Sequence, residues 1–144
     1  MSADIVTISS LILAKLQTIS QLNAVYEYQP AKTTNGKYPY ASVTPMTFTG
    51  DFADTIRNKR TYDFAVRVFQ ERNKSTFGNE KAERVMRELV DLILTAFDND
   101  TRLGGAVKWV KPARGDLSYQ ATEVGDTRIC EIILEVHTVV DSTT

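Results

Sequence analysis

Cysteine and histidine, the side chains that most often serve as nucleophile, base or metal ligand, occur once each, as Cys130 and His137. Both lie in a segment that alternates apolar and polar residues, so a β-strand there places them on opposite faces. A Cys–His nucleophile needs the two groups within hydrogen-bond reach, and one Cys with one His cannot form a structural zinc site. We therefore interpret Cys130 as a core residue and His137 as a surface residue.

Carboxylate pairs also lack the spacing that hydrolysis needs. Glu131 and Glu135 share one face of this strand, but four strand residues separate them by roughly 13 Å, beyond the ~5–9.5 Å of glycosidase pairs. The run Asp98-Asn99-Asp100 resembles the start of a calcium loop, yet Leu103 stands where that loop needs glycine and Trp109 where it needs glutamate. The chain has no phosphate loop, dinucleotide fingerprint or nucleophile elbow. The sequence therefore predicts no enzyme, no cofactor and no metal.

Two basic clusters could contact nucleic acid, the second of them around Trp109. They are Arg57, Lys59 and Arg60, and Lys108, Lys111 and Arg114. Strand aromatics could likewise stack RNA bases, although no RNP-like motif accompanies them; they are Tyr26, Tyr28, Tyr38, Tyr40 and Phe48. However, 17 basic residues stand against 18 acidic ones, and a nucleic-acid binder is usually basic. We interpret the clusters as solvated edges, with Trp109 packed inward beside Val107.

The elements that would position these residues fit one domain, residues 1–144. The segment from Asp4 to Ile19 predicts a helix, with Asp4 as its N-cap and an apolar stripe at spacings of three and four. The segment from Glu80 to Phe97 predicts a second amphipathic helix with a charged outer side. The apolar content of 42% and charged content of 24% are typical of a globular protein.

Six strands are predicted around these helices, at residues 24–29, 38–49, 59–71, 107–111, 116–122 and 128–139. Asn35-Gly36 could join the first two as a long hairpin, and Pro45 indicates an edge strand or a bulge. The segment Gly50–Asn58 is polar and predicts a loop. The order α-β-β-β-α-β-β-β predicts an α+β fold, an antiparallel or mixed sheet with two helices packed on one face.

The first residues show no signal-peptide pattern, and their longest apolar run, Leu11-Ile12-Leu13-Ala14, is far shorter than the ~20 residues of a membrane span. The sequence therefore predicts a soluble protein made in a cytoplasm, with no membrane partner.

Three features point to assembly with other proteins. The outer side of the first helix is nearly uncharged, as interface cores are, or else it is buried on both sides within the monomer. Phe52 and Ile56 lie in the polar loop and would be exposed anchors there, unless the loop folds back on the core. The strand at 38–49 could be an edge, and edges invite pairing with neighbours.

The order of these elements, with the strand pattern Tyr62, Phe64, Val66 and Val68 before a charged helix, resembles the tail terminator, or tail completion, proteins of long-tailed bacteriophages. The resemblance runs from Asp4 to Val140. It implies a virion protein of the tail or neck, assembled in the host cytoplasm as a homohexameric ring. Such a ring caps the tail tube, stops its polymerisation and joins it to the head connector, with DNA only as passing cargo.

On this interpretation we expect loop contacts at Phe52, Asp54, Ile56 and Arg57, and subunit contacts at Thr7, Ser10 and Thr18. Two alternatives stay open. One is a head-completion (neck) protein of the same virion. The other is a small ligand-binding or hydrolase domain.

Overall fold

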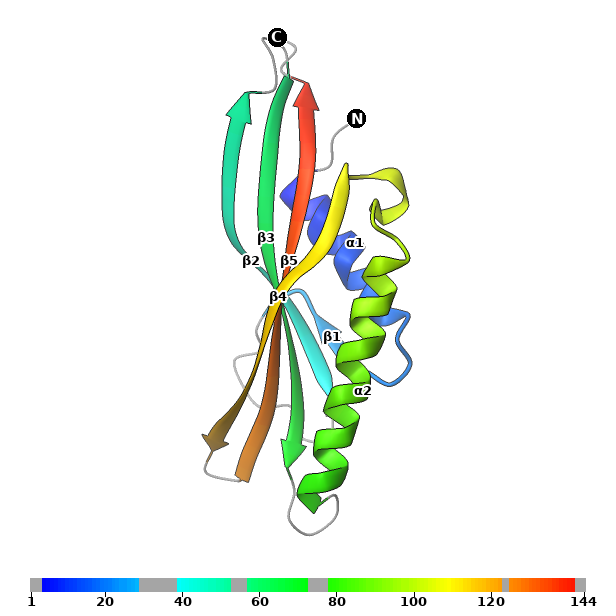
Figure 1. Ribbon diagram of the computed structural model, residues 1–144, viewed down its shortest axis with the longest axis vertical. Coiled ribbons are helices and arrows are strands. Elements are labelled where there is room, and N and C mark those ends of the chain that lie inside the picture. Colours follow the sequence, from blue (N-terminus) through cyan, green and yellow to red (C-terminus); the bar gives the residue numbers. More distant parts are fainter. Residues whose placement is uncertain (1–3, 29–38, 53–56, 73–77, 123–124, 142–144) are drawn as a thin grey trace.

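The computed structural model describes residues 4–28, 39–52, 57–72, 78–122 and 125–141 (Figure 1). It has two helices and a five-stranded mixed sheet, which confirms the predicted α+β class. The elements in chain order are α1 (Ile5–Gln17), β1 (Ala24–Tyr26), β2 (Tyr40–Phe52), β3 (Arg57–Arg72), α2 (Gly78–Asp98), the 3-10 turn η1 (Leu103–Gly105), β4 (Trp109–Thr122) and β5 (Gly125–Asp141).

The strands lie in the order β1-β2-β3-β5-β4, and all neighbours are antiparallel except β1 and β2. The predicted hairpin between the first two strands is therefore wrong, because Ala24–Tyr26 runs parallel to Tyr40–Ser42. Parallel neighbours need a crossover of a dozen or more residues, and the connection at 27–39 has that length.

The two strands predicted at 107–111 and 116–122 form one strand, β4, so the sheet has one strand fewer than expected. Pro112 does not end the strand, because the register against β5 shifts between Pro112 and Arg114 and this bulge accommodates a residue that cannot donate a hydrogen bond. The same device operates at Pro45, where the register of β2 shifts before Thr47. A bulge was one of the two alternatives predicted at Pro45.

The predicted loop Gly50–Asn58 is mostly strand. Gly50 pairs with Arg60, and Phe52 with Asn58, so only residues 53–56 lie outside the strands, beyond the described part. This end of the β2–β3 ribbon carries no alternation of apolar and polar residues, because the helices do not cover it: every side chain from Pro45 to Gly50 is exposed. It therefore resembles a loop in sequence.

Both helices lie on one face of the twisted sheet, as predicted (Figure 1). The core on that face takes alternate residues of neighbouring strands, and the pairs Val66–Ile132 and Phe64–Leu134 lie at its centre. The helices add their apolar stripes: Ile8, Ile12 and Leu16 from α1, and Met86, Leu89, Ile93 and Phe97 from α2.

The start of α1 is capped as the sequence predicts. The carboxylate of Asp4 accepts a hydrogen bond from the backbone N–H of Thr7 at 2.8 Å, and this bond lowers the pKa of Asp4. No helix of the described residues is long and apolar enough to cross a membrane.

Candidate assembly surfaces

Cys130 lies in the core with 2% of its surface exposed. Burial raises the pKa of its thiol to about 11, so the group is protonated at neutral pH and is a poor nucleophile. This agrees with its interpretation as a core residue.

His137 lies on the opposite, open face of the sheet. Its Nε2 is 2.7 Å from Oε1 of Glu135, and its Nδ1 is 3.4 Å from Oγ1 of Thr61. Its ring stacks on Trp109, with centroids 3.5 Å apart. The prediction that Trp109 packs inward is wrong: Trp109 pairs with His137 across the strands, and its neighbour Val110 takes the inward position.

Polar and charged pairs cross part of this face. Arg67 Nε lies 2.8 Å from Oε2 of Glu131, and Thr47 donates to Asp63 at 2.8 Å. Glu135 is bonded to His137, and this bond lowers its pKa. The described residues include no group of three His, Cys, Asp or Glu side chains that could hold a metal ion. These contacts pair the polar groups with one another on a face that also buries apolar side chains, among them Ala65 and Phe69.

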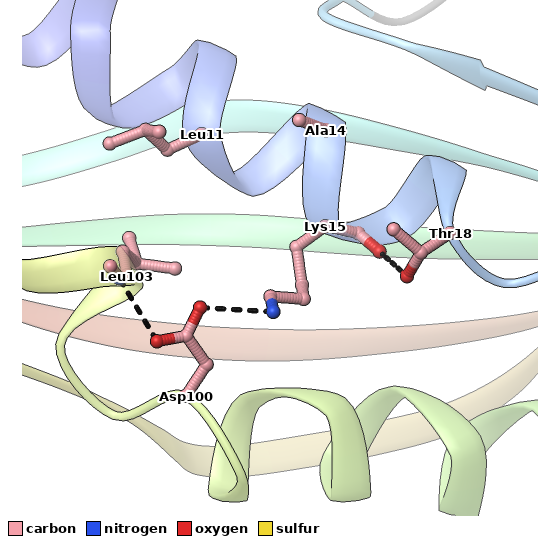
Figure 2. A pocket seen from close by; sticks show the side chains of 7 residues that line it. Leu11, Ala14, Lys15, Thr18, Asp100 and Leu103 are labelled. Carbon is pink, nitrogen blue, oxygen red and sulfur yellow. Dashed lines mark hydrogen bonds and ion pairs between the residues drawn. The ribbon is translucent and has the colours of Figure 1, made fainter.

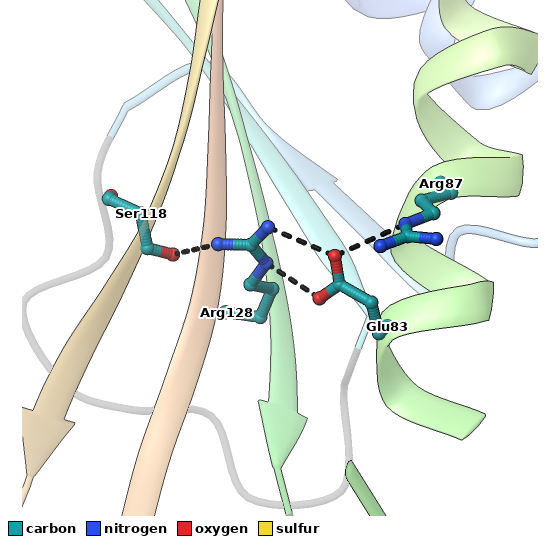
Figure 3. A network of polar contacts seen from close by, with 4 residues as sticks. All are labelled: Glu83, Arg87, Ser118 and Arg128. Carbon is teal, nitrogen blue, oxygen red and sulfur yellow. Dashed lines mark hydrogen bonds and ion pairs between the residues drawn. The ribbon is translucent and has the colours of Figure 1, made fainter. Parts of the chain in front are cut away.

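Glu83 and Arg128 join α2 to β5 beneath the helix layer (Figure 3). Arg128 Nε lies 2.8 Å from one oxygen of the Glu83 carboxylate, and Arg128 donates from its terminal nitrogen to the other oxygen at 3.0 Å. Arg128 also donates to the carbonyl oxygen of Ser118 on β4 at 3.3 Å, while Arg87 lies against the same carboxylate. A two-pronged ion pair thus joins α2 to β5, and the same guanidinium reaches β4 through a hydrogen bond.

A hollow of about 270 Å³ separates α1 from the turn after α2 (Figure 2). Leu11, Ala14 and Leu103 give it apolar walls, and at its side the Nζ of Lys15 lies 2.9 Å from Oδ2 of Asp100. The other Asp100 oxygen accepts the backbone N–H of Gly104 at 3.0 Å. Asp98–Asp100 therefore forms the helix-ending turn that the sequence predicted.

We expect Asp100→Asn to lower the free energy of unfolding by about 1 kcal/mol at pH 7. The Gly104 N–H, and then Lys15, hold the pKa of Asp100 below its ordinary value. The stabilisation is therefore present above the unfolded pKa and is lost as pH falls through the folded pKa. Urea titrations of both proteins at a series of pH values measure this. A difference that persists unchanged into strong acid would contradict it.

The predicted loop contacts fall at the end of the β2–β3 ribbon. Phe52 is the last residue of β2 and Arg57 the first of β3, so the fold brings their backbones to one end, opposite the start of α2 (Figure 1). Asp54 and Ile56 lie outside the described residues. The contact role of all four stays a prediction.

The predicted subunit contacts lie on the exposed side of α1, so this helix is not buried on both sides within the monomer. Thr18 donates its hydroxyl to the carbonyl of Lys15 at 2.6 Å, and Ser10 donates to Glu27 at 3.2 Å. Thr7 is exposed, next to Val6, which has 70% of its surface exposed. Their role in an interface also stays a prediction.

Sequence reasoning missed two features that are suited to an interface. Phe48, on β2, has 74% of its surface exposed, and Leu117, on β4, has 44%. A hollow of about 180 Å³ lies between α2 and β4, lined in part by Val90, Leu94 and Leu117. The place of Phe48 after the Pro45 bulge was visible in the sequence, but its exposure depends on where the helix layer ends, which the sequence does not show.

No known family model matches the chain, and no curated protein matches it. Among solved structures, a chain in the virion of a native gene transfer agent (GTA) particle has a similar fold, with a TM-score of 0.62. That match covers 92% of this chain and 95% of the other, at 17% sequence identity. A second solved structure aligns over 95% of this chain and 93% of its own at 20% identity, with a TM-score of only 0.43, which supports no conclusion.

Proposed function

We propose that this protein is a structural component of a phage-like virion, and within it a tail terminator, the subunit of a ring that caps the tail tube. The observation that carries the proposal is the likeness to a chain of a gene transfer agent virion, which extends over nearly the whole of both chains. The order of elements, α-β-β-β-α-β-β, also supports the proposal, because it keeps the leading helix, the charged second helix and the final strand pair on which the resemblance to tail terminators rests.

The mechanism follows from symmetry. Contacts between two different surfaces of each subunit close into a ring when the rotation between neighbours closes. One ring surface would copy the docking surface of the tube subunit, while the other would not, and tube growth would stop there. The protein then acts through shape, and DNA passes through the ring as cargo.

The double variant Phe52→Ala/Ile56→Ala tests the predicted loop contact. We expect it to fold normally and to lose at least about tenfold in affinity for purified tail tubes, because two apolar anchors are removed. Leu92→Ala, which truncates an exposed apolar side chain on α2, is the matched control and should bind as the native protein does. Co-sedimentation with tail tubes and with filled heads measures both.

Normal tube binding by the double variant would remove the loop from the interface. Binding of the native protein to filled heads, without binding to tubes, would contradict the terminator role and assign the protein to head completion.

A further inference from the structure

Two strand edges of the sheet have no partner among the described residues. At one side β4 is the last strand along its whole length, Trp109–Thr122. At the other side β1 covers only Tyr40–Ser42 of β2, which leaves the rest of that strand, from Val43, open. Unpaired backbone N–H and C=O groups of such edges are templates for pairing with another chain.

The two edges have the right directions to pair with each other. Three successive antiparallel pairings, β2 with β3, β3 with β5 and β5 with β4, make β4 antiparallel to β2. A second copy related by rotation about an axis along the strands keeps these directions. Its β2 would therefore meet β4 of the first copy as an antiparallel neighbour, the more stable kind of pair.

An exposed aromatic side chain and an apolar hollow lie on the same face of these edges. Phe48 pairs with Tyr62, a core residue, and so points to the helix side of the sheet. Leu117 pairs with Cys130 and points to the same side, where it lines the 180 Å³ hollow with Val90 and Leu94. Edge pairing would bring Phe48 of one copy to the side on which its neighbour has this hollow.

The register between copies can bring Phe48 of one copy to the hollow of its neighbour. Phe48 is level with Val110 across the sheet, through Tyr62 and Val136. In a closed sheet with strands tilted by about 35–45° and spaced by about 4.8 Å, crossing the four strands of one copy slides the register by about 13–19 Å, or about four to six residues. A slide toward the hairpin end of β4 carries Phe48 level with Gly115 after four residues and with Leu117 after six, and both residues line the hollow.

The charges of the edges are complementary. Strand β4 carries Lys111 and Arg114 against the single acid Asp116, whereas residues 43–52 of β2 contain one acid, Asp51, and no base. Two β2 edges would therefore bring like charges together, and so would two β4 edges. The mixed pairing joins opposite net charges, which favours partners of opposite edge.

We propose that each copy adds the open edge of β2 to the β4 edge of a second copy of this chain, with Phe48 seated in the hollow between α2 and β4. Because the contact joins two different surfaces, its repetition closes a ring when the rotation between neighbours closes. This inference rests on the proposed ring and names the surfaces that build it.

Disulfide trapping tests the contact. In a Cys130→Ala background, which removes the native thiol paired with Leu117, we expect Phe48→Cys/Leu117→Cys to cross-link into dimers, trimers and larger species under mild oxidation. The parity control is Phe48→Cys/Asp116→Cys, because Asp116 is adjacent to Leu117 but on the other face. It should give less than about a tenth of the cross-linking.

Single variants decide between the possible edge pairings. Phe48→Cys alone should stay uncross-linked, and its equimolar mixture with Leu117→Cys should give dimers only. Cross-linking of Phe48→Cys alone would overturn the proposal in favour of pairing between two β2 edges. Equal trapping at Asp116 would overturn it as well.

A second measurement separates this inference from the proposed function. Phe48→Lys should weaken self-association by at least about tenfold, whereas Leu92→Lys should leave it within about twofold. A ring of native size formed by Phe48→Lys would overturn the edge contact and leave the ring in place. If Val6→Lys loses the ring while Phe48→Lys keeps it, the contact between copies lies on α1 instead. A native protein that stays a monomer at every concentration would overturn both the contact and the ring.

Discussion

Phe64→Ala should lower the free energy of unfolding by about 4 kcal/mol, whereas Phe48→Ala should change it by less than about 0.5 kcal/mol. Both side chains project from the same face of the sheet, from the neighbouring strands β3 and β2. Phe64 is 0% exposed beneath the helices, while Phe48 is 74% exposed. Removing the first opens a cavity in a packed core, and removing the second opens none.

Urea unfolding followed by circular dichroism, at a protein concentration low enough to prevent association, measures both changes. The comparison also tests the edge contact, because a side chain that meets a neighbouring copy must be free in the subunit. A loss of several kcal/mol for Phe48→Ala would show that this ring packs within its own subunit, and would contradict its proposed role.

Glu83→Ala should lower the free energy of unfolding by about 3 kcal/mol, because it removes a carboxylate that meets the largely buried Arg128 guanidinium through both of its oxygens. The Arg128 side chain is 9% exposed and meets both oxygens of Glu83. Glu88→Ala, an exposed position on the same helix, is the control and should cost less than about 0.5 kcal/mol. Replacing both partners, as Glu83→Leu/Arg128→Met, should recover most of the loss.

The same pair predicts an acid dependence with a definite sign. The hydrogen bond from Arg128 holds the pKa of Glu83 below its ordinary value. The contribution is present above the unfolded pKa of the carboxyl group and disappears as pH falls through the folded pKa. The native protein and Glu83→Gln should therefore converge in stability in acid. Equal stability at pH 7, or a gap that widens in acid, would show that the pair contributes little.

The helices and the core strands were predictable because burial of one side makes apolar residues repeat along the sequence at the helix or strand spacing. The stripe of α1 and the alternation of Tyr62, Phe64, Val66 and Val68 follow directly from which face meets the core. The Asp4 cap and the Pro45 bulge follow from local chemistry. Each of these signals lies in a few neighbouring residues, so a single sequence contains it.

The errors arose where pairing between distant residues decides the structure. Nothing local distinguishes a parallel β1 from a hairpin strand, because a strand has the same alternation of side chains in either direction. A proline often ends a strand, but the pairing of β4 with β5 continues past Pro112 through a bulge. Trp109 faces outward because the pairing with His137 sets its parity, and the sequence around it contains no sign of that register.

The candidate surfaces were predictable only in part. The outer side of α1 was recognised by its lack of charge, and the structure leaves it exposed. The free edges of β2 and β4 depend on strand order, which the sequence does not contain, and the exposure of Phe48 depends on where the helix layer stops. A shape-based function therefore leaves a weak sequence signal, because it requires complementary surfaces and no particular reactive residue.

The central claim, that this chain forms a ring that halts a growing tail tube, is tested most directly by electron microscopy of tube protein polymerised with and without the purified protein. We predict tubes that become shorter as the protein is added, each with ring-shaped density at one end and none along its length. Tubes of unchanged length with bare ends, or tubes that incorporate the protein throughout and keep growing, would contradict the account.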